Sequence, residues 1–179
     1  MSKLGKKIIS VPKDSKVAIQ GNSVTVTGPK GTEKILFNEK VFSSKLNEKN
    51  EFMISPLKKD KSSSAMWGTY RSLINNAIFG VTKGHEKNLE LSGVGFKVAQ
   101  QGDELKLKLG FSHEAIYKVP KGINIKIEKQ TKINISGTDK SLVSKVASEI
   151  KSLKPVEPYK AKGIKEKDQY IIRKEGKKK

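Results

Sequence analysis

The chain has 179 residues, of which 37 are Lys or Arg and 18 are Asp or Glu, so its formal net charge is +19. Self-repulsion of this size opposes compaction, and nucleic acid is the leading candidate for the polyanion that relieves it. The sequence has no long apolar run, no helix with Lys opposite bulky apolar residues, and no Cys, which argues against membrane binding and excludes disulfides and thiolate metal sites.

Two segments of the chain share a motif and an alternating pattern. VPKDSKVAIQGNSVTVTGPKG begins at Val11, and VPKGINIKIEKQTKINISGTDK begins at Val119. Their apolar residues match at an offset of 108 residues and, after one extra residue, at 109. Both alternate with a period of two, as half-buried strands do, and Gly21-Asn22 fits a tight turn. We therefore predict an internal duplication in which each segment forms a strand pair.

An amphipathic helix is predicted after each alternating segment. The apolar residues of the first are Met66, Trp67, Tyr70, Leu73, Ile74, Ala77 and Ile78. Those of the second are Leu142, Val143, Val146, Ala147, Ile150 and Leu153. We expect the serines at 62–64 to cap the first helix and Gly80 to end it, whereas Thr138 or Asp139 caps the second and Pro155 stops it.

Further strands are expected between these elements, and they complete two small domains. The candidates are Thr32–Phe37, Glu51–Leu57, Leu89–Leu91, Phe96–Gln100 and Leu105–Leu109. Gln101-Gly102-Asp103-Glu104 is a hairpin signal, and Gly28-Pro29-Lys30-Gly31 also fits a hairpin turn. The prediction is an α+β fold of two similar domains, residues 1–82 and 83–179, each an antiparallel sheet packed by one helix.

Positive charge is densest after the second predicted helix. Residues 154–179 carry 10 basic and 4 acidic side chains in KPVEPYKAKGIKEKDQYIIRKEGKKK. We expect Pro155 and Pro158 to hold this extension straight, and Gly163 to let the backbone approach a phosphate closely. Tyr159 among basic residues suits RNA, because an aromatic ring can stack on a base or pack on a ribose. A disordered, solubilising tail is the alternative.

The type of cation also bears on recognition. Only Arg71 and Arg173 are Arg, and all other cations are Lys. Lys is a point charge suited to phosphates, whereas Arg reads base edges, so the balance favours recognition of RNA backbone and shape. A genome rich in Lys codons would give the same balance. Arg71 lies on the first helix, where an RNA contact and an intradomain hydrogen bond fit equally well.

Several blocks of the sequence resemble one known family. PVEPYKAKGIK followed by RKEGKKK resembles the C-terminal signature of the bacterial-type ribosomal protein L6 family. AMWGTYRSLINNAIFGVTKG (65–84) resembles its first-domain helix and linker, and LELSGVGFKV and LGFSHEAIYKVPKGI resemble its second-domain strands. The blocks span essentially the whole chain. Departures are Ala161 in place of the usual Gly, Glu166-Lys167 in place of a basic–aromatic pair, and Glu114 in place of Pro.

The resemblance implies a structural constituent of the large ribosomal subunit that binds large-subunit rRNA in the cytoplasm. It would lie near the sarcin–ricin loop and the stalk base, beside neighbouring ribosomal proteins and docking translation factors, without catalysis, cofactor, membrane or small-molecule substrate. The residues predicted to contact RNA are Lys154, Tyr159, Lys160, Lys162, Gly163, Lys165, Arg173, Lys174, Lys177, Lys178, Lys179 and Arg71.

Other motifs that could indicate chemistry have simpler interpretations. Gly93-Val94-Gly95 lacks the third Gly and the βαβ context of a nucleotide-binding loop, so we interpret it as a tight bend. His85 and His113 are the only histidines and have no acidic cluster nearby, which argues against a metal site. Trp67 is expected in the core. A free-standing nucleic-acid chaperone and an RNA-modifying enzyme remain as alternative functions.

Overall fold

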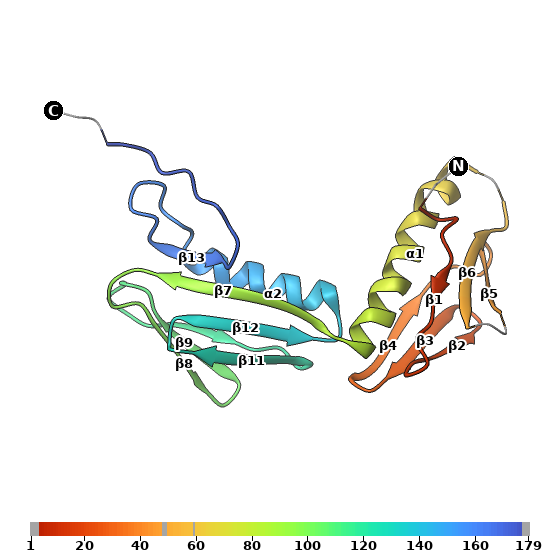
Figure 1. Ribbon diagram of the computed structural model, residues 1–179, viewed down its shortest axis with the longest axis horizontal. Helices are drawn as coiled ribbons and strands as arrows, with labels where there is room; N and C mark the ends of the chain where they lie inside the picture. The colour runs from red at the N-terminus through yellow and green to blue at the C-terminus, as the bar shows by residue number, and fades with distance from the viewer. Residues whose placement is uncertain (1–3, 48–49, 59, 177–179) are drawn as a thin grey trace. The chain divides into compact units, whose positions relative to one another are not determined.

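Residues 4–47, 50–58 and 60–176 are described by a computed structural model, and they form two units (Figure 1). One unit comprises Met1–His85 with Thr138–Lys140, and the other comprises Glu86–Gly137 with Ser141–Lys179. Each unit combines antiparallel strands with one helix over its own apolar core. The predicted α+β class with an internal duplication is confirmed.

The first unit contains two three-stranded sheets, ordered β2-β3-β4 and β1-β6-β5, and one helix. Its elements are β1 (Ile9–Ser10), β2 (Lys16–Gln20), β3 (Ser23–Gly28), β4 (Gly31–Leu36), β5 (Phe42–Leu46), β6 (Glu51–Pro56) and α1 (Lys61–Thr82). Gly21-Asn22 forms the predicted two-residue turn, with Gly21 at a φ of 50°, where a side chain is disfavoured. The turn at 28–31 is also confirmed, because Gly28 pairs with Gly31.

The second unit contains sheets ordered β10-β9-β8 and β11-β12-β7-β13. Its elements are β7 (His85–Ser92), β8 (Lys97–Gln101), β9 (Glu104–Lys108), β10 (Ala115–Lys118), β11 (Ile123–Glu128), β12 (Lys132–Gly137), α2 (Lys140–Leu153) and β13 (Gly163–Glu166). The predicted hairpin at 101–104 joins β8 to β9. The sequence patterns missed β1, β5, β10 and β13, because strands this short offer too few residues to show a period.

The duplication exists, but the predicted offset of 108 residues is wrong. It pairs β2–β3 with β11–β12, and these hairpins lie in sheets that do not correspond. The counterpart of β2–β3 is β8–β9, since KVAIQGN from Lys16 matches KVAQQGD from Lys97 at an offset of 81. The same offset relates β5 to β11 and β6 to β12. Period-two alternation is common to all half-buried strand pairs, so it cannot identify which pairs are equivalent.

Both ends of α1 differ from the prediction. Asp60 is the N-cap residue, and Ser63 lies within the first turn, where its hydroxyl donates to the carbonyls of Lys58 and Asp60. The helix continues through Gly80 and ends at Thr82. It stops there because Gly84 adopts a φ of 83°, the left-handed conformation that favours Gly after a helix.

The apolar face of α1 is narrower than predicted, whereas that of α2 is confirmed. Met66 and Leu73 are 41% and 39% exposed, so they do not belong to the core. Trp67 is buried as expected, and its indole N–H donates to the Ile54 carbonyl at 2.7 Å. On α2, the buried residues are Val143, Val146, Ala147 and Ile150. Leu142 and Leu153 pack partly buried against the same core.

Candidate nucleic-acid interface

The basic extension reverses direction directly after α2. The amide of Ile164 donates to the Lys154 carbonyl, and the amide of Glu157 donates to the Lys162 carbonyl, both at 2.9 Å. These bonds pair the two arms of a narrow loop whose tip contains Pro158, Tyr159 and Lys160. The expectation that Pro155 and Pro158 hold this stretch straight is therefore wrong. Proline fixes only its own φ and the preceding residue's preference, so a turn can follow it.

Two small residues make the reversal possible. Ala161 adopts a φ of 53°, a left-handed conformation that is costly for a residue with a side chain. Its amide donates to the Glu157 carbonyl at 3.0 Å. Gly163 has a φ of 141°, and a Cβ there would lie 2.7 Å from the Pro155 carbonyl oxygen. The close backbone approach at Gly163 is therefore to the chain itself, and its predicted RNA contact stays a prediction.

Strand β13 attaches the extension to the body of the second unit. It pairs antiparallel with β7, with Ile164 opposite Leu91 and Lys165 opposite Glu90. Ile164 is fully buried in the core, and the ammonium of Lys165 lies 3.5 Å from a Glu90 carboxylate oxygen. Lys165 is thus partly neutralised within the protein, although it was predicted to meet RNA.

The last described residues run back beside the tip of the loop (Figure 1). The amide of Lys174 donates to the Pro158 carbonyl at 3.0 Å, which places the two segments next to each other. Tyr170 and Ile172 on this final segment are 87% and 73% exposed. The sequence analysis did not single out Tyr170, yet its ring is even more accessible than that of Tyr159, which is 53% exposed. Two accessible aromatic rings therefore belong to the extension.

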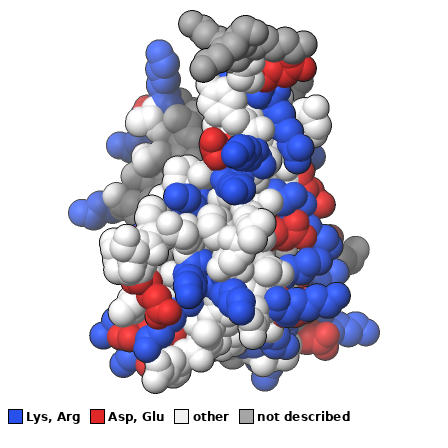
Figure 2. All heavy atoms as spheres, turned by 90° about the vertical axis from the view of Figure 1, so that its left-hand side faces the viewer, with Lys and Arg blue, Asp and Glu red and all other residues white. Residues whose placement is uncertain are grey.

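Four of the predicted cations are exposed and form no ion pair with another described residue. They are Lys160, Lys162, Arg173 and Lys174. The structure brings them together on the loop and on the segment that returns beside it. Lys and Arg prevail over Asp and Glu across the face shown in Figure 2. The predicted contacts Lys177, Lys178 and Lys179 lie outside the described residues.

Lys154 has an aromatic partner that the sequence did not indicate. Its ammonium lies 4.3 Å from the centre of the Phe111 ring, within the range of a cation–π interaction. The His113 ring stacks near Phe111, with a centroid distance of 6.1 Å and an interplanar angle of 14°. These residues are more than 40 positions apart in the sequence. Only the return of the chain after α2 brings them together, so no local pattern could have revealed the contact.

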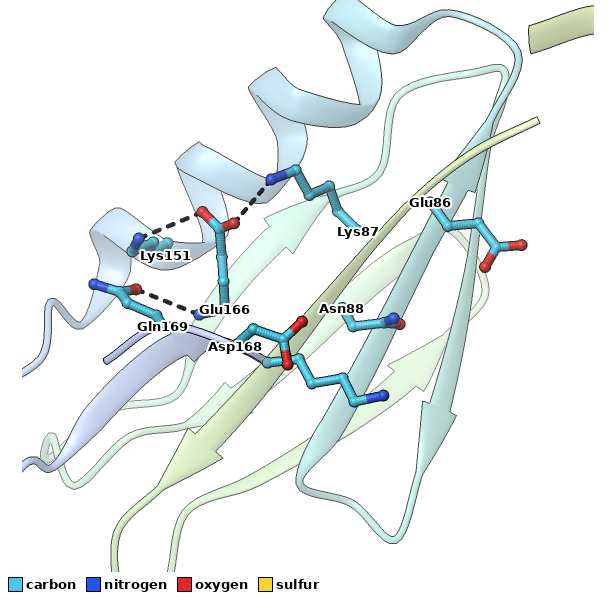
Figure 3. A pocket seen from close by; sticks show the side chains of 8 residues that line it. Glu86, Lys87, Asn88, Lys151, Glu166, Asp168 and Gln169 are labelled. Carbon is cyan, nitrogen blue, oxygen red and sulfur yellow. Dashed lines mark hydrogen bonds and ion pairs between the residues drawn. The ribbon is translucent and has the colours of Figure 1, made fainter. Parts of the chain in front are cut away.

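A second group of charges at the base of the extension was also not predicted. The Glu166 carboxylate lies 2.8 Å from the Lys87 ammonium and 3.5 Å from the Lys151 ammonium (Figure 3). The hydrogen bond from Lys87 lowers the pKa of Glu166 below its usual range and outweighs the opposing effect of burial. The charges of Lys87 and Lys151 lower it further. Glu166 was noted in the sequence only because it replaces a residue type common in the family.

Arg71 belongs to the first unit and has an intradomain partner. Its Nε–H donates to the Lys7 carbonyl at 3.3 Å, which is one of the two roles that the sequence left open. An RNA contact by Arg71 stays a prediction. His85 hydrogen-bonds with the Asn76 carbonyl at 2.9 Å. Within the described ranges, no group of three or more His, Cys, Asp or Glu side chains could hold a metal ion, and no helix is long and apolar enough to cross a membrane.

Comparison with known proteins places this arrangement in context. The family described as Ribosomal protein L6 matches residues 11–84 and 92–167, one segment from each half of the duplication. A large ribosomal subunit protein uL6 from Nitratiruptor is 47% identical over 99% of this chain and 98% of its own length. Proteins of the same name from Bartonella henselae and Rhizobium meliloti are 48% and 44% identical, each over the full length of both chains.

Proposed function

The chain belongs to the ribosomal protein L6 family, and we propose on that premise that it is a structural component of the large ribosomal subunit. It binds large-subunit rRNA directly through the extension that follows α2. The observation that carries this proposal is the convergence of Lys160, Lys162, Arg173 and Lys174 beside the exposed ring of Tyr159. The carboxylates that pair with Lys165 and Lys87 leave these four cations unpaired within the described chain.

The proposed mechanism is electrostatic and architectural. The four unpaired cations neutralise backbone phosphates, and each such contact releases condensed counterions. Tyr159 packs on a base or ribose of non-helical RNA. The paired loop and β13 hold these groups on the second unit before RNA arrives, which reduces the ordering cost of binding. None of these steps requires a nucleophile, a cofactor or a metal ion.

The family resemblance supports a more specific location for this contact. We place the protein near the sarcin–ricin loop and the stalk base, beside neighbouring large-subunit proteins and the surface where translation factors dock. Its role there is to stabilise the RNA architecture, and its compartment is the cytoplasm, as part of the ribosome. The large excess of Lys over Arg suits this role, because folded rRNA is recognised mainly by backbone and shape.

Salt dependence of RNA affinity tests the proposed interface. Lys160→Ala and Lys162→Ala should each make the slope of log affinity against log salt shallower by about one, whatever the RNA sequence. Lys126→Ala is the matched control, since this exposed lysine lies on β11 at the opposite sheet edge from β13. Unchanged slopes for both tail variants would show that the extension does not bind phosphates.

Sedimentation separates this function from its two alternatives. The tagged protein should co-sediment stoichiometrically with large subunits in sucrose gradients and prefer one folded rRNA segment. A nucleic-acid chaperone would instead bind many duplexes with similar affinity. An RNA-modifying enzyme would turn over rRNA and lose that activity on substitution of one Ser, His or Asp.

A further inference from the structure

The Glu166 carboxylate occupies a position between two lysines that come from different elements. Lys87 lies on β7, Lys151 on the last turn of α2, and Glu166 at the end of β13. Figure 3 shows the carboxylate between the two ammonium groups, with one oxygen facing each lysine. The distances are 2.8 Å to Lys87 and 3.5 Å to Lys151. Two ammonium groups held by a strand and a helix thus converge on a single anion.

This ion-pair group is accessible to an outside ligand. The side chains of Lys87 and Glu166 are both 41% exposed, and that of Lys151 is 32% exposed. They line an open pocket together with Lys167 and Gln169. Half-exposed ion pairs contribute little to stability, because water and salt screen them. Exchange of the carboxylate for another anion therefore carries a small energetic cost.

The backbone holds β13 in place without help from the Glu166 side chain. Ile164 is fully buried, and the amide of Lys167 donates to the Asn88 carbonyl at 3.1 Å. Just beyond the strand, the amide of Gln169 donates to the Glu166 carbonyl at 3.0 Å. The carboxylate can consequently leave the two lysines while the strand remains paired. Its contact with them does not account for the position of the strand.

We propose that Lys87 and Lys151 form a binding site for an RNA backbone phosphate, and that Glu166 occupies this site in the free protein as an internal competitor. The inference rests on the proposed function, because it adds a phosphate contact to the same RNA-binding unit. Two oxygens of a phosphate can engage both ammonium groups as the two carboxylate oxygens do. The bound phosphate displaces the carboxylate into solvent, so Glu166 weakens RNA binding and limits it to RNA that also engages the extension.

Neutralising the competitor tests the sign of this effect. Glu166→Gln should raise affinity for purified large-subunit rRNA about threefold at low salt. Glu86→Gln is the matched control: it removes one negative charge from the same pocket, and the Glu86 carboxylate points away from the lysines in Figure 3. The proposal requires a larger increase for Glu166→Gln than for Glu86→Gln. An equal increase, or a loss of affinity, would overturn it.

A double-mutant cycle then tests whether the lysines are responsible. Lys87→Ala should have little effect in the wild-type chain, where Glu166 already neutralises the site, but it should abolish the gain of Glu166→Gln. Lys151→Ala should behave in the same way. If the gain persists without either lysine, the phosphate does not bind between them. Thermal unfolding of each variant, followed by circular dichroism, confirms that the compared proteins are folded.

Inorganic phosphate distinguishes an RNA site from a site for small anions. Titration of Glu166→Gln with inorganic phosphate, followed through the lysine side-chain NMR signals, should shift Lys87 and Lys151 only at concentrations far above those of rRNA needed for the same shift. Tighter binding of inorganic phosphate than of rRNA would overturn the assignment to RNA. Failure of the proposed function has a separate signature: wild-type protein without salt-dependent rRNA affinity, and unchanged slopes for Lys160→Ala and Lys162→Ala.

Discussion

The two units share one arrangement of strands, and they differ at a single sheet edge. The sheet β5-β6-β1 of the first unit corresponds to β11-β12-β7 of the second, at an offset of 81 residues for the paired strands. In the second unit, β13 adds a fourth strand next to β7, and no described residue of the first unit pairs with the equivalent edge of β1. The chain that supplies β13 is also the chain that carries the exposed cations. The duplication thus supplied a scaffold twice, and one edge of one copy became the support for the extension.

The largest expected effect comes from removing the residue that anchors β13. Ile164→Ala should lower the free energy of unfolding by about 2–4 kcal/mol, because it leaves a cavity at a fully buried site. It should also weaken rRNA affinity, since the extension loses its attachment. Urea denaturation and filter binding measure the two effects. Ile54→Ala is the matched variant in the first unit, where the side chain is 1% exposed. It should cost a similar amount of stability and leave RNA affinity of the folded protein unchanged.

Adding a methyl group at Gly163 should have the next largest effect. The new Cβ would lie 2.7 Å from backbone atoms of Pro155 and Val156, which cannot move as a flexible side chain would. We expect Gly163→Ala to cost about 1–3 kcal/mol by urea denaturation. Gly102→Ala in the β8–β9 turn is the control, because nothing lies within 4 Å of its Cβ position. If both variants lose the same stability, the crowding at Gly163 is not what distinguishes the extension.

Relaxing the strain at Ala161 should have a smaller and opposite effect. Ala161→Gly removes a side chain from a left-handed conformation, and the gain exceeds the extra flexibility that Gly gives to the unfolded chain. We expect a net stabilisation of about 0.5 kcal/mol, measured as a higher urea midpoint. The turns of both units already have Gly at such positions, as at Gly21 and Gly102. A lower midpoint would mean that the buried methyl group of Ala161 matters more than its backbone strain.

The smallest effect concerns the pH dependence contributed by Glu166. Its pKa is lowered in the folded protein, so its ion pairs stabilise the fold above the ordinary pKa range of Glu. That contribution is lost as pH falls through the lowered pKa. The melting temperatures of wild type and Glu166→Gln should therefore differ slightly near neutral pH and converge in acid. Because the group is 41% exposed, screening keeps the difference small. A gap that widens as pH falls would contradict the assignment.

Much of the fold followed from local patterns, and the candidate interface followed only in part. The alternating residues of β3 and the apolar face of α2 predict burial correctly, because each element can be recognised from its own period. The helix end at Gly84 was misplaced at Gly80, since either Gly satisfies the same local rule. Tyr159 and Lys160 are exposed as an interface requires, whereas the pairings of Lys154 with Phe111 and Lys165 with Glu90 were not foreseen. Both contacts join residues that are distant in sequence.

The sequence alone determined the α+β class, the two helices, the main hairpins and the concentration of positive charge after α2, because composition and periodicity are local properties. Tertiary structure alone decided which hairpins are equivalent, where the extension reverses, and which cations remain unpaired. The physical reason is that strand pairing and ion pairing depend on contacts between distant segments. β13 is the clearest case: four residues with no distinctive period become a core strand only because the edge of β7 is open to receive them.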